Sequence, residues 1–135
     1  MSTNGLEYRV LVSEYARRHY IKVFAKKYKN IWIETEQSVF VLLAKLDNVI
    51  GATNRVEIIH NKDCYKIIKV DFKISGSDQS AKFSGNRALV FVDEMKRECQ
   101  ILLVYSKNDI SPPNETQKWQ VIIKENYIDI WEKFY

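Results

Sequence analysis

The chain has 135 residues, 46% of them hydrophobic, with only 4 glycines and 2 prolines, which excludes a disordered chain and favours a single folded domain over residues 1–135. No apolar run approaches the ~20 residues that a membrane-spanning helix needs, and the start of the chain, MSTNGLE, lacks the regions of a signal peptide, so we expect a cytoplasmic protein without membrane association. Residues 1–87 carry 15 Lys and Arg against 9 Asp and Glu, whereas residues 88–135 carry 6 against 8, and this favours a polyanionic partner for the N-terminal portion.

A short strand and a basic helix are predicted first along the chain. The strand covers residues 8–12, and Ser13 with Glu14 then supplies an N-cap and a first-turn acid for a helix that ends near Lys29. One helix face is apolar and the other is basic. The basic residues are Arg17, Arg18, Lys22, Lys26, Lys27 and Lys29. This basic ridge could follow a nucleic-acid backbone or bind an acidic partner, and the alternative is an ordinary solvated face.

A second helix is predicted to begin at Thr35, where a possible N-cap precedes the acidic Glu36. Leucine and valine continue at helical spacing to a stop at residues 48–51. The two helices would form a hairpin, and residues 55–60 favour a short strand after it.

The next segment changes to the period-two pattern of a strand with one buried face. Ile68, Val70, Phe72 and Ile74 alternate with the polar positions Lys69, Asp71 and Lys73. Residues 75–80 have the composition of a loop. Cys64 and Cys99 lack the spacing of a zinc site or a disulfide framework, so we expect both to be small buried hydrophobes.

A β-hairpin and a final helix complete the predicted fold. The apolar runs 88–92 and 101–105 are separated by polar residues 93–98, which is typical of a hairpin. After a break at Pro112 and Pro113, aromatic and aliphatic residues from Trp119 to Trp131 form the stripe of one long helix. The predicted class is α+β: an N-terminal helical hairpin packed on an antiparallel sheet, with a C-terminal helix and a core over about residues 8–125.

A row of cations is predicted across three strands of this sheet. A loop centred near Asp78 places Lys69 opposite Arg87, and a turn centred near residues 96–97 places Arg87 opposite Lys107. Lys73 and Tyr105 would share that face, and Lys82 could join it from the loop. Like charges in a row are destabilising unless an anion lies between them, which indicates a phosphate-binding site. The alternative is that these cations cap strand ends and pair with Asp71, Asp93 or Asp109.

Two segments and the order of the elements resemble the RelE/ParE toxin superfamily, and most closely its HigB-like branch. The segments are Ser84-Gly85-Asn86-Arg87, which enters an apolar strand, and residues 102–109, LLVYSKND, which close the hairpin. The helical hairpin with Phe24-Ala-Lys-Lys-Tyr28 and the lysine-bearing strand agree in order. The loose resemblance therefore extends over about residues 8–125.

The resemblance implies a toxin of a toxin–antitoxin pair that cleaves mRNA in the ribosomal A site and needs no metal or other cofactor. In that chemistry a ribose 2′-OH attacks the adjacent phosphate, and fixed cations neutralise the transition state. Arg87 would clamp the phosphate and Lys107 would hold a second oxygen or the leaving group. Lys69, Lys73 and Lys82 compete for the remaining role. Tyr105 or Tyr127 would stack on a base or donate a proton, unless each is a core aromatic.

The resemblance also implies particular partners. These are mRNA on the ribosome and a cognate antitoxin protein that covers the basic surface. Some members of the superfamily inhibit DNA gyrase without an RNase site, so a noncatalytic toxin of the same fold is the alternative to an endoribonuclease.

Overall fold

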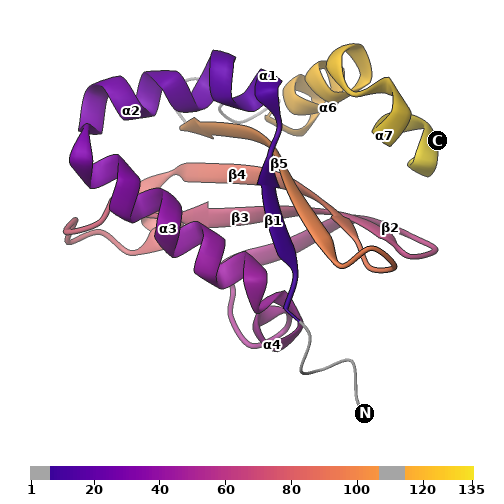
Figure 1. Cartoon of the computed structure of the whole chain (residues 1–135), viewed down its shortest axis with the longest axis horizontal. Coiled ribbons are helices and arrows are strands. Elements are labelled where there is room, and N and C mark those ends of the chain that lie inside the picture. Colours follow the sequence, from indigo (N-terminus) through magenta and orange to yellow (C-terminus); the bar gives the residue numbers. More distant parts are fainter. Residues whose placement is uncertain (1–6, 107–114) are drawn as a thin grey trace.

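The computed structural model describes residues 7–106 and 115–135, and it consists of three layers, with a sheet between two groups of helices (Figure 1). The five strands are β1 Arg9–Val12, β2 Val56–Lys62, β3 Tyr65–Phe72, β4 Asn86–Asp93 and β5 Glu98–Ser106. The helices are α1 Glu14–Ala16, a π-helical turn Arg17–Ile21, α2 Lys22–Tyr28, α3 Asn30–Ala44, α4 Leu46–Val49, α5 Ala81–Ser84, α6 Glu115–Asn126 and α7 Ile128–Phe134. In these two described segments, no helix is long and apolar enough to cross a membrane.

The sheet has the strand order β1-β5-β4-β3-β2. Strands β2 to β5 form an antiparallel meander, as the sequence predicts. The short strand β1 adds to the edge beside β5 in parallel, with Arg9 opposite Glu98 and Val12 opposite Ile101. The strand pattern alone did not predict this parallel pairing, because β1 and β5 are separated by most of the chain.

One face of the sheet is covered by the helical hairpin of α2 and α3. The period-two pattern of β3 is confirmed here, since Ile68, Val70 and Phe72 are buried in this layer. The rings of Phe24, Trp32 and Phe72 contact one another at the centre, with centroid distances of 5.1 to 6.0 Å. Ser13 is the N-cap of the first helix, because its Oγ accepts a hydrogen bond from the Ala16 N–H at 3.0 Å.

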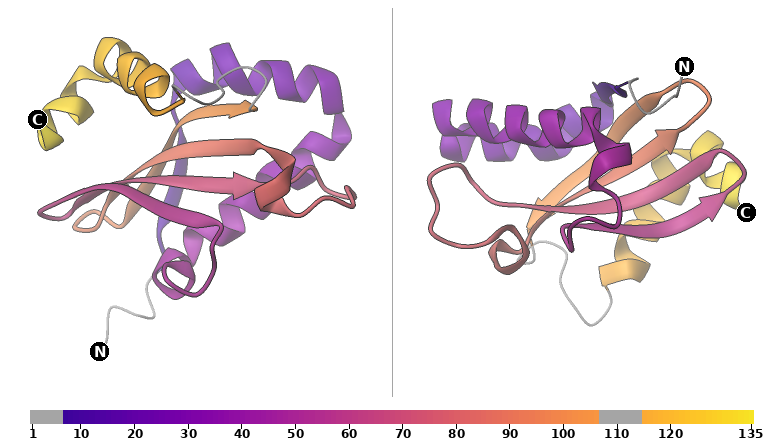
Figure 2. Two further views of the ribbon diagram at one scale, coloured as in Figure 1. Left: turned by 180° about the vertical axis from the view of Figure 1, so that it is seen from behind. Right: turned by 90° about the horizontal axis from the view of Figure 1, so that it is seen from below.

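The other face is covered by α6 and α7, and Figure 2 shows the sheet between these helices and the hairpin. Trp119, Ile123 and Ile130 are buried against the sheet, which confirms that the apolar stripe packs. The predicted single helix is interrupted at Tyr127, which has φ −137° and ψ 52°. Its hydroxyl donates to the Leu102 carbonyl at 2.7 Å and thereby fixes the break to the sheet.

The second helix begins five residues before the predicted N-cap. Lys29 adopts φ 54° between α2 and α3, so the chain turns there and α3 starts at Asn30. Thr35 is therefore an interior position of α3, and the N-cap prediction is wrong. Its fully buried hydroxyl donates to the Ile31 carbonyl and accepts from the Ser75 N–H, both at 2.9 Å. The bond to Ser75 joins α3 to the loop after β3.

Replacing Thr35 with valine should lower the free energy of unfolding by about 1–2 kcal/mol, because the partly buried Ser75 N–H loses its acceptor while the shape of the side chain is kept. Urea unfolding measures this difference. The matched control is Ser38→Ala, since the exposed Ser38 hydroxyl bonds only to a carbonyl of its own helix; it should change stability by less than ~0.5 kcal/mol. Equal stability of Thr35→Val and the wild type would show that the loop is not held through Thr35.

The two cysteines differ in their surroundings. Cys99 is fully buried, and this burial raises the pKa of its thiol to about 12. Cys64 is half-buried, and both thiols are free. The expectation of a small buried hydrophobe is therefore confirmed for Cys99 and only partly met by Cys64.

Candidate anion-binding site

The predicted cations lie on neighbouring strands, but their register differs from the prediction. Arg87 stands opposite Asp71 on β3 and Tyr105 on β5, whereas Lys69 stands opposite Leu89. The prediction that Lys69 pairs directly with Arg87 is wrong by two residues. The connection between β3 and β4 contains the one-turn helix α5 and the left-handed Gly85 (φ 75°), so its centre does not lie at Asp78. A shift of two residues keeps every side chain on its face.

A β-bulge in β5 determines what lies beside Arg87. Leu89 pairs with Leu103 but Val90 pairs with Ile101, so Leu102 is an extra residue in β5. Without it, Val104 would stand opposite Arg87. The bulge therefore brings Tyr105, with its hydroxyl group, next to the guanidinium.

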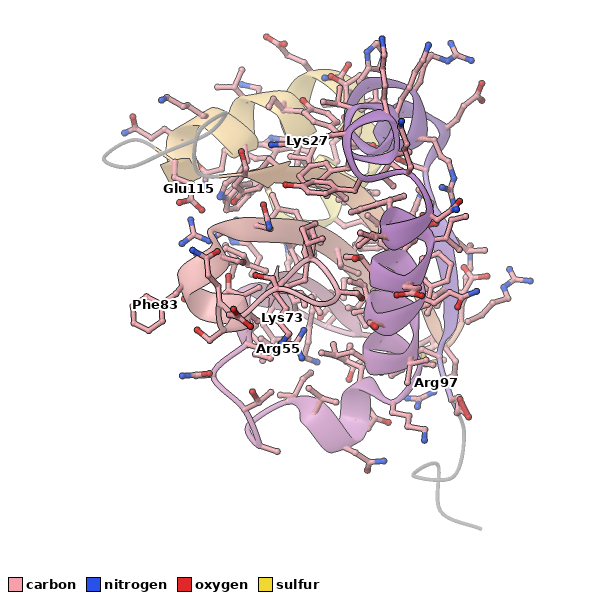
Figure 3. All side chains as sticks on the ribbon, turned by 90° about the vertical axis from the view of Figure 1, so that its left-hand side faces the viewer. Lys27, Arg55, Lys73, Phe83, Arg97 and Glu115 are labelled. Atoms are coloured by element: carbon pink, nitrogen blue, oxygen red, sulfur yellow. The ribbon has the colours of Figure 1, made fainter. Side chains whose placement is uncertain are left out.

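Three donors from three strands converge on one carboxylate, that of Glu115 at the start of α6. Figure 3 marks the position of Glu115. Glu115 Oε1 accepts a hydrogen bond from Arg87 Nη1 on β4. Glu115 Oε2 accepts from the Tyr105 hydroxyl on β5 at 2.7 Å, and Lys69 Nζ on β3 lies 3.8 Å from the same oxygen. Arg87 Nε also contacts Asp71 Oδ1 at 3.3 Å. The sheet face thus presents a formed site for an anion, which the protein's own carboxylate occupies.

Burial makes this arrangement electrostatically strong. The Arg87 and Lys69 side chains are each 20% exposed and that of Glu115 is 10% exposed, so water screens the charges only in part. Burial raises the pKa of Asp71, and the neighbouring Arg87 and Lys69 oppose that rise. Burial and the hydrogen bond to Glu115 raise the pKa of Tyr105, so its hydroxyl stays protonated and serves as a donor. Lys69 Nζ also lies 3.9 Å from Oε2 of the exposed Glu57, so the two cations face two mostly buried carboxylates and one exposed carboxylate.

The structure brings together Arg87 and Lys69 of the five residues predicted as catalytic. Lys73 lies outside the cluster, just beyond the end of β3, and its Nζ donates to the Ser77 carbonyl at 3.4 Å. Lys82 lies in α5, but its side chain is outside the described part of the structure. Lys107 lies outside the described residues. The alternative of pairing with Asp71 holds for Arg87.

Tyr105 was predicted to stack on an RNA base or to be a core aromatic, and the structure supports the core position. Its ring is fully buried and has no free face for a base. The hydroxyl is nevertheless part of the anion site through Glu115. Within this cluster Tyr105 therefore contributes a hydrogen bond and no exposed ring face.

Ion pairs neutralise two of the six cations of the basic ridge on the first helix. Arg17 pairs with Glu36 at 2.8 Å, and Arg18 pairs with Glu14 one turn earlier. Lys22 and Lys26 are exposed, and neither makes an ion pair within residues 7–106 and 115–135. Lys27 and Lys29 are also exposed and make no ion pair with the described residues, so four cations of the ridge face solvent.

Comparisons with known proteins concern the fold. No protein-family model and no curated protein sequence matches the chain. Among solved structures, one chain of the archaeal RelE–RelB complex from Pyrococcus horikoshii OT3 superposes with a TM-score of 0.50, over 76% of this chain and 97% of that chain, at 12% sequence identity. This chain has a RelE-like fold. The predicted α+β class is confirmed by the RelE-like arrangement of sheet and helices, while membership of the HigB-like branch stays a prediction.

Proposed function

We propose that this RelE-like chain is the toxin of a type II toxin–antitoxin pair and cleaves mRNA on the ribosome as a metal-independent endoribonuclease. The convergence of Arg87, Tyr105 and Lys69 on the Glu115 carboxylate supports this proposal most directly. A phosphate group, like this carboxylate, is bound by several hydrogen-bond donors arranged around it. The scissile phosphate would take the place of that carboxylate after Glu115 moves away.

The proposed reaction is attack of a ribose 2′-OH on the adjacent phosphate, which leaves a 2′,3′-cyclic phosphate and a free 5′-OH. Arg87 binds the phosphate, because its guanidinium already has one nitrogen on Asp71 and presents another to the anion. Lys69 and the Tyr105 hydroxyl hold further phosphate oxygens, and fixed donors of this kind stabilise the transition state without reorganisation. Lys107, Lys73 and Lys82 remain candidates for the other catalytic roles.

We further propose that an antitoxin covers the unpaired cations of the basic ridge, among them Lys22 and Lys26. The structure that this chain resembles is a complex of RelE with RelB, which supports a protein partner for the toxin. Exposed lysines without acidic neighbours favour an acidic segment in such a partner.

One observation favours a second candidate, a noncatalytic toxin of the same fold that inhibits DNA gyrase or another target. Arg87 and Lys69 are neutralised by Asp71 and Glu115, and a closed ion-pair network of this kind also occurs as a purely structural feature.

Induced expression followed by mapping of RNA 5′ ends separates the two candidates. Cleavage in the ribosomal A site should produce breaks in register with codons. Breaks without codon register, or growth inhibition without any breaks, would contradict the endoribonuclease and favour the noncatalytic toxin.

A further inference from the structure

A second pair of cations lies apart from the anion-binding site, on the α3 side of the sheet. Arg55 and Lys73 line a pocket of about 270 Å³ together with the hydroxyl-bearing residues Ser75 and Ser80. Figure 3 shows the two cationic side chains next to each other, away from Glu115. Basic and hydroxyl groups around one small pocket are suited to a phosphate.

These cations lack the acidic partners that close the first site. Arg55 Nε donates to the backbone carbonyl of Asp71 at 3.2 Å, and Lys73 Nζ donates to the Ser77 carbonyl at 3.4 Å. Neither side chain makes an ion pair with any carboxylate in the described part of the chain. Two uncompensated cations beside one pocket are stabilised when an anion enters it.

The short helix α5, which borders this pocket, carries an exposed aromatic ring. Phe83 of α5 is 78% exposed, and Figure 3 shows it projecting away from the body of the protein. Ala81 of the same one-turn helix lines the cationic pocket. An exposed phenylalanine next to a cationic pocket is a platform on which a nucleic-acid base stacks.

A larger pocket of about 690 Å³ continues from the first one across Ser75, which lines both. Ser84 at the end of α5 lines it, with Lys27, Tyr28 and Asn86. Asn86 is 9% exposed, yet its side-chain amide makes no hydrogen bond to the described residues. A free amide in a mostly buried position can bind the edge of a base, and Lys27 at the same pocket can meet a phosphate.

We propose that these two pockets and the ring of Phe83, on the short helix α5 that borders both, form a path for single-stranded RNA. A backbone phosphate lies in the pocket of Arg55 and Lys73, one base stacks on Phe83, and the next nucleotide enters the larger pocket toward Asn86. The inference rests on the proposed function, since it assigns the binding of an RNA substrate to a surface away from Glu115, and it gives Lys73 an RNA-binding role in place of a catalytic one. An RNA strand accounts for a cation pair, an exposed ring and an unpartnered amide at once.

The test measures binding by the full chain to a fluorescent 2′-O-methyl oligoribonucleotide of about ten nucleotides. This probe lacks the attacking 2′-OH, so binding is measured independently of cleavage. The double variant Arg55→Gln/Lys73→Gln should weaken binding at least tenfold and reduce the slope of log K against log salt by roughly 0.7, the value for one lost phosphate on a single strand. Phe83→Ala should weaken binding about tenfold without changing that slope.

The control is the double variant Lys62→Gln/Lys96→Gln, which makes the same change in charge at the opposite end of the sheet. Both lysines are exposed and lie beside the turns that follow β2 and β4. This variant should change the dissociation constant by less than about twofold. An equal loss in both double variants, or unchanged binding by Phe83→Ala, would overturn the proposed path.

An acidic polypeptide is the competing occupant, and polyglutamate serves as its probe. If Phe83→Ala and the Arg55/Lys73 variant weaken polyglutamate binding as much as RNA binding, the surface belongs to a protein partner and the RNA path is wrong. Wild-type binding to the uncleavable RNA that depends on these residues, without cleavage of messages in cells, would leave the path standing and contradict only the endoribonuclease.

Discussion

Arg87→Lys is expected to reduce mRNA cleavage at least about 100-fold while the protein remains folded. Lysine keeps the positive charge, but one ammonium cannot replace a guanidinium that contacts Asp71 through Nε and Glu115 through Nη1. Arg87→Ala is less informative, because it leaves two carboxylates without their cation and would destabilise the fold by about 3–5 kcal/mol. The cleavage rate on ribosome-bound message and the thermal unfolding midpoint are the two measurements.

Arg97→Lys is the matched control for this prediction. The Arg97 side chain is also 20% exposed and also bonds to a carboxylate, that of Asp47, but it lies away from Glu115 (Figure 3). Arg97→Lys should destabilise the protein as much as Arg87→Lys does, or less, and its cleavage rate should stay within about twofold of wild type. If Arg97→Lys lost cleavage to the same extent, the effect at Arg87 would reflect stability rather than phosphate binding.

Glu115→Gln is expected to tighten binding of uncleavable single-stranded RNA by about five- to tenfold. The carboxylate competes with phosphate for Arg87, Tyr105 and Lys69, and a neutral amide makes hydrogen bonds about half as strong as a charged one. The same change should lower the free energy of unfolding by about 1–3 kcal/mol, since the protein loses its internal anion. Anisotropy titration measures the increase in RNA affinity, and urea unfolding measures the decrease in stability.

Glu125→Gln separates this effect from a change in net charge. Glu125 is exposed on the same helix, α6, and makes no ion pair with the described residues. Its substitution should alter RNA affinity by less than about twofold. Unchanged RNA affinity in Glu115→Gln would show that phosphate does not bind where the carboxylate lies, and the proposed catalytic site would have to be placed elsewhere.

Most of the fold follows from local patterns that the sequence carries plainly. The alternation of Ile68, Val70 and Phe72 with polar residues is a period-two signal, and the core confirms it. The start of α3 was misplaced because Thr35-Glu36 has the composition of an N-cap, whereas the true boundary is the backbone turn at Lys29. The interruption at Tyr127 depends on a hydrogen bond to Leu102 of a distant strand, which periodicity does not reveal.

The candidate site was predictable only in part, because it depends on register. The prediction that Lys69 and Arg87 lie near each other holds despite the two-residue error in strand register, since a shift of two residues keeps each side chain on the same face of its strand. The pairing of Tyr105 with Arg87 depends on the bulge at Leu102, which the apolar run around it does not indicate. Glu115 gave no signal beyond that of an acidic residue in the first turn of a helix, because only the folded chain brings α6 to the start of β4 and the end of β5.

The parallel pairing of β1 with β5 has a consequence for the order in which the protein matures. Arg9 and its partner Glu98 are 89 residues apart, so at ~5–20 residues per second the first strand waits roughly 4 to 18 s for its neighbour during translation. Arg87, Tyr105 and Glu115 are also synthesised late. The nascent chain therefore holds an incomplete sheet and no finished anion site until most of its length has left the ribosome. The protein, which we propose acts on ribosomes, therefore lacks a complete anion site while it is still attached to the ribosome that translates it.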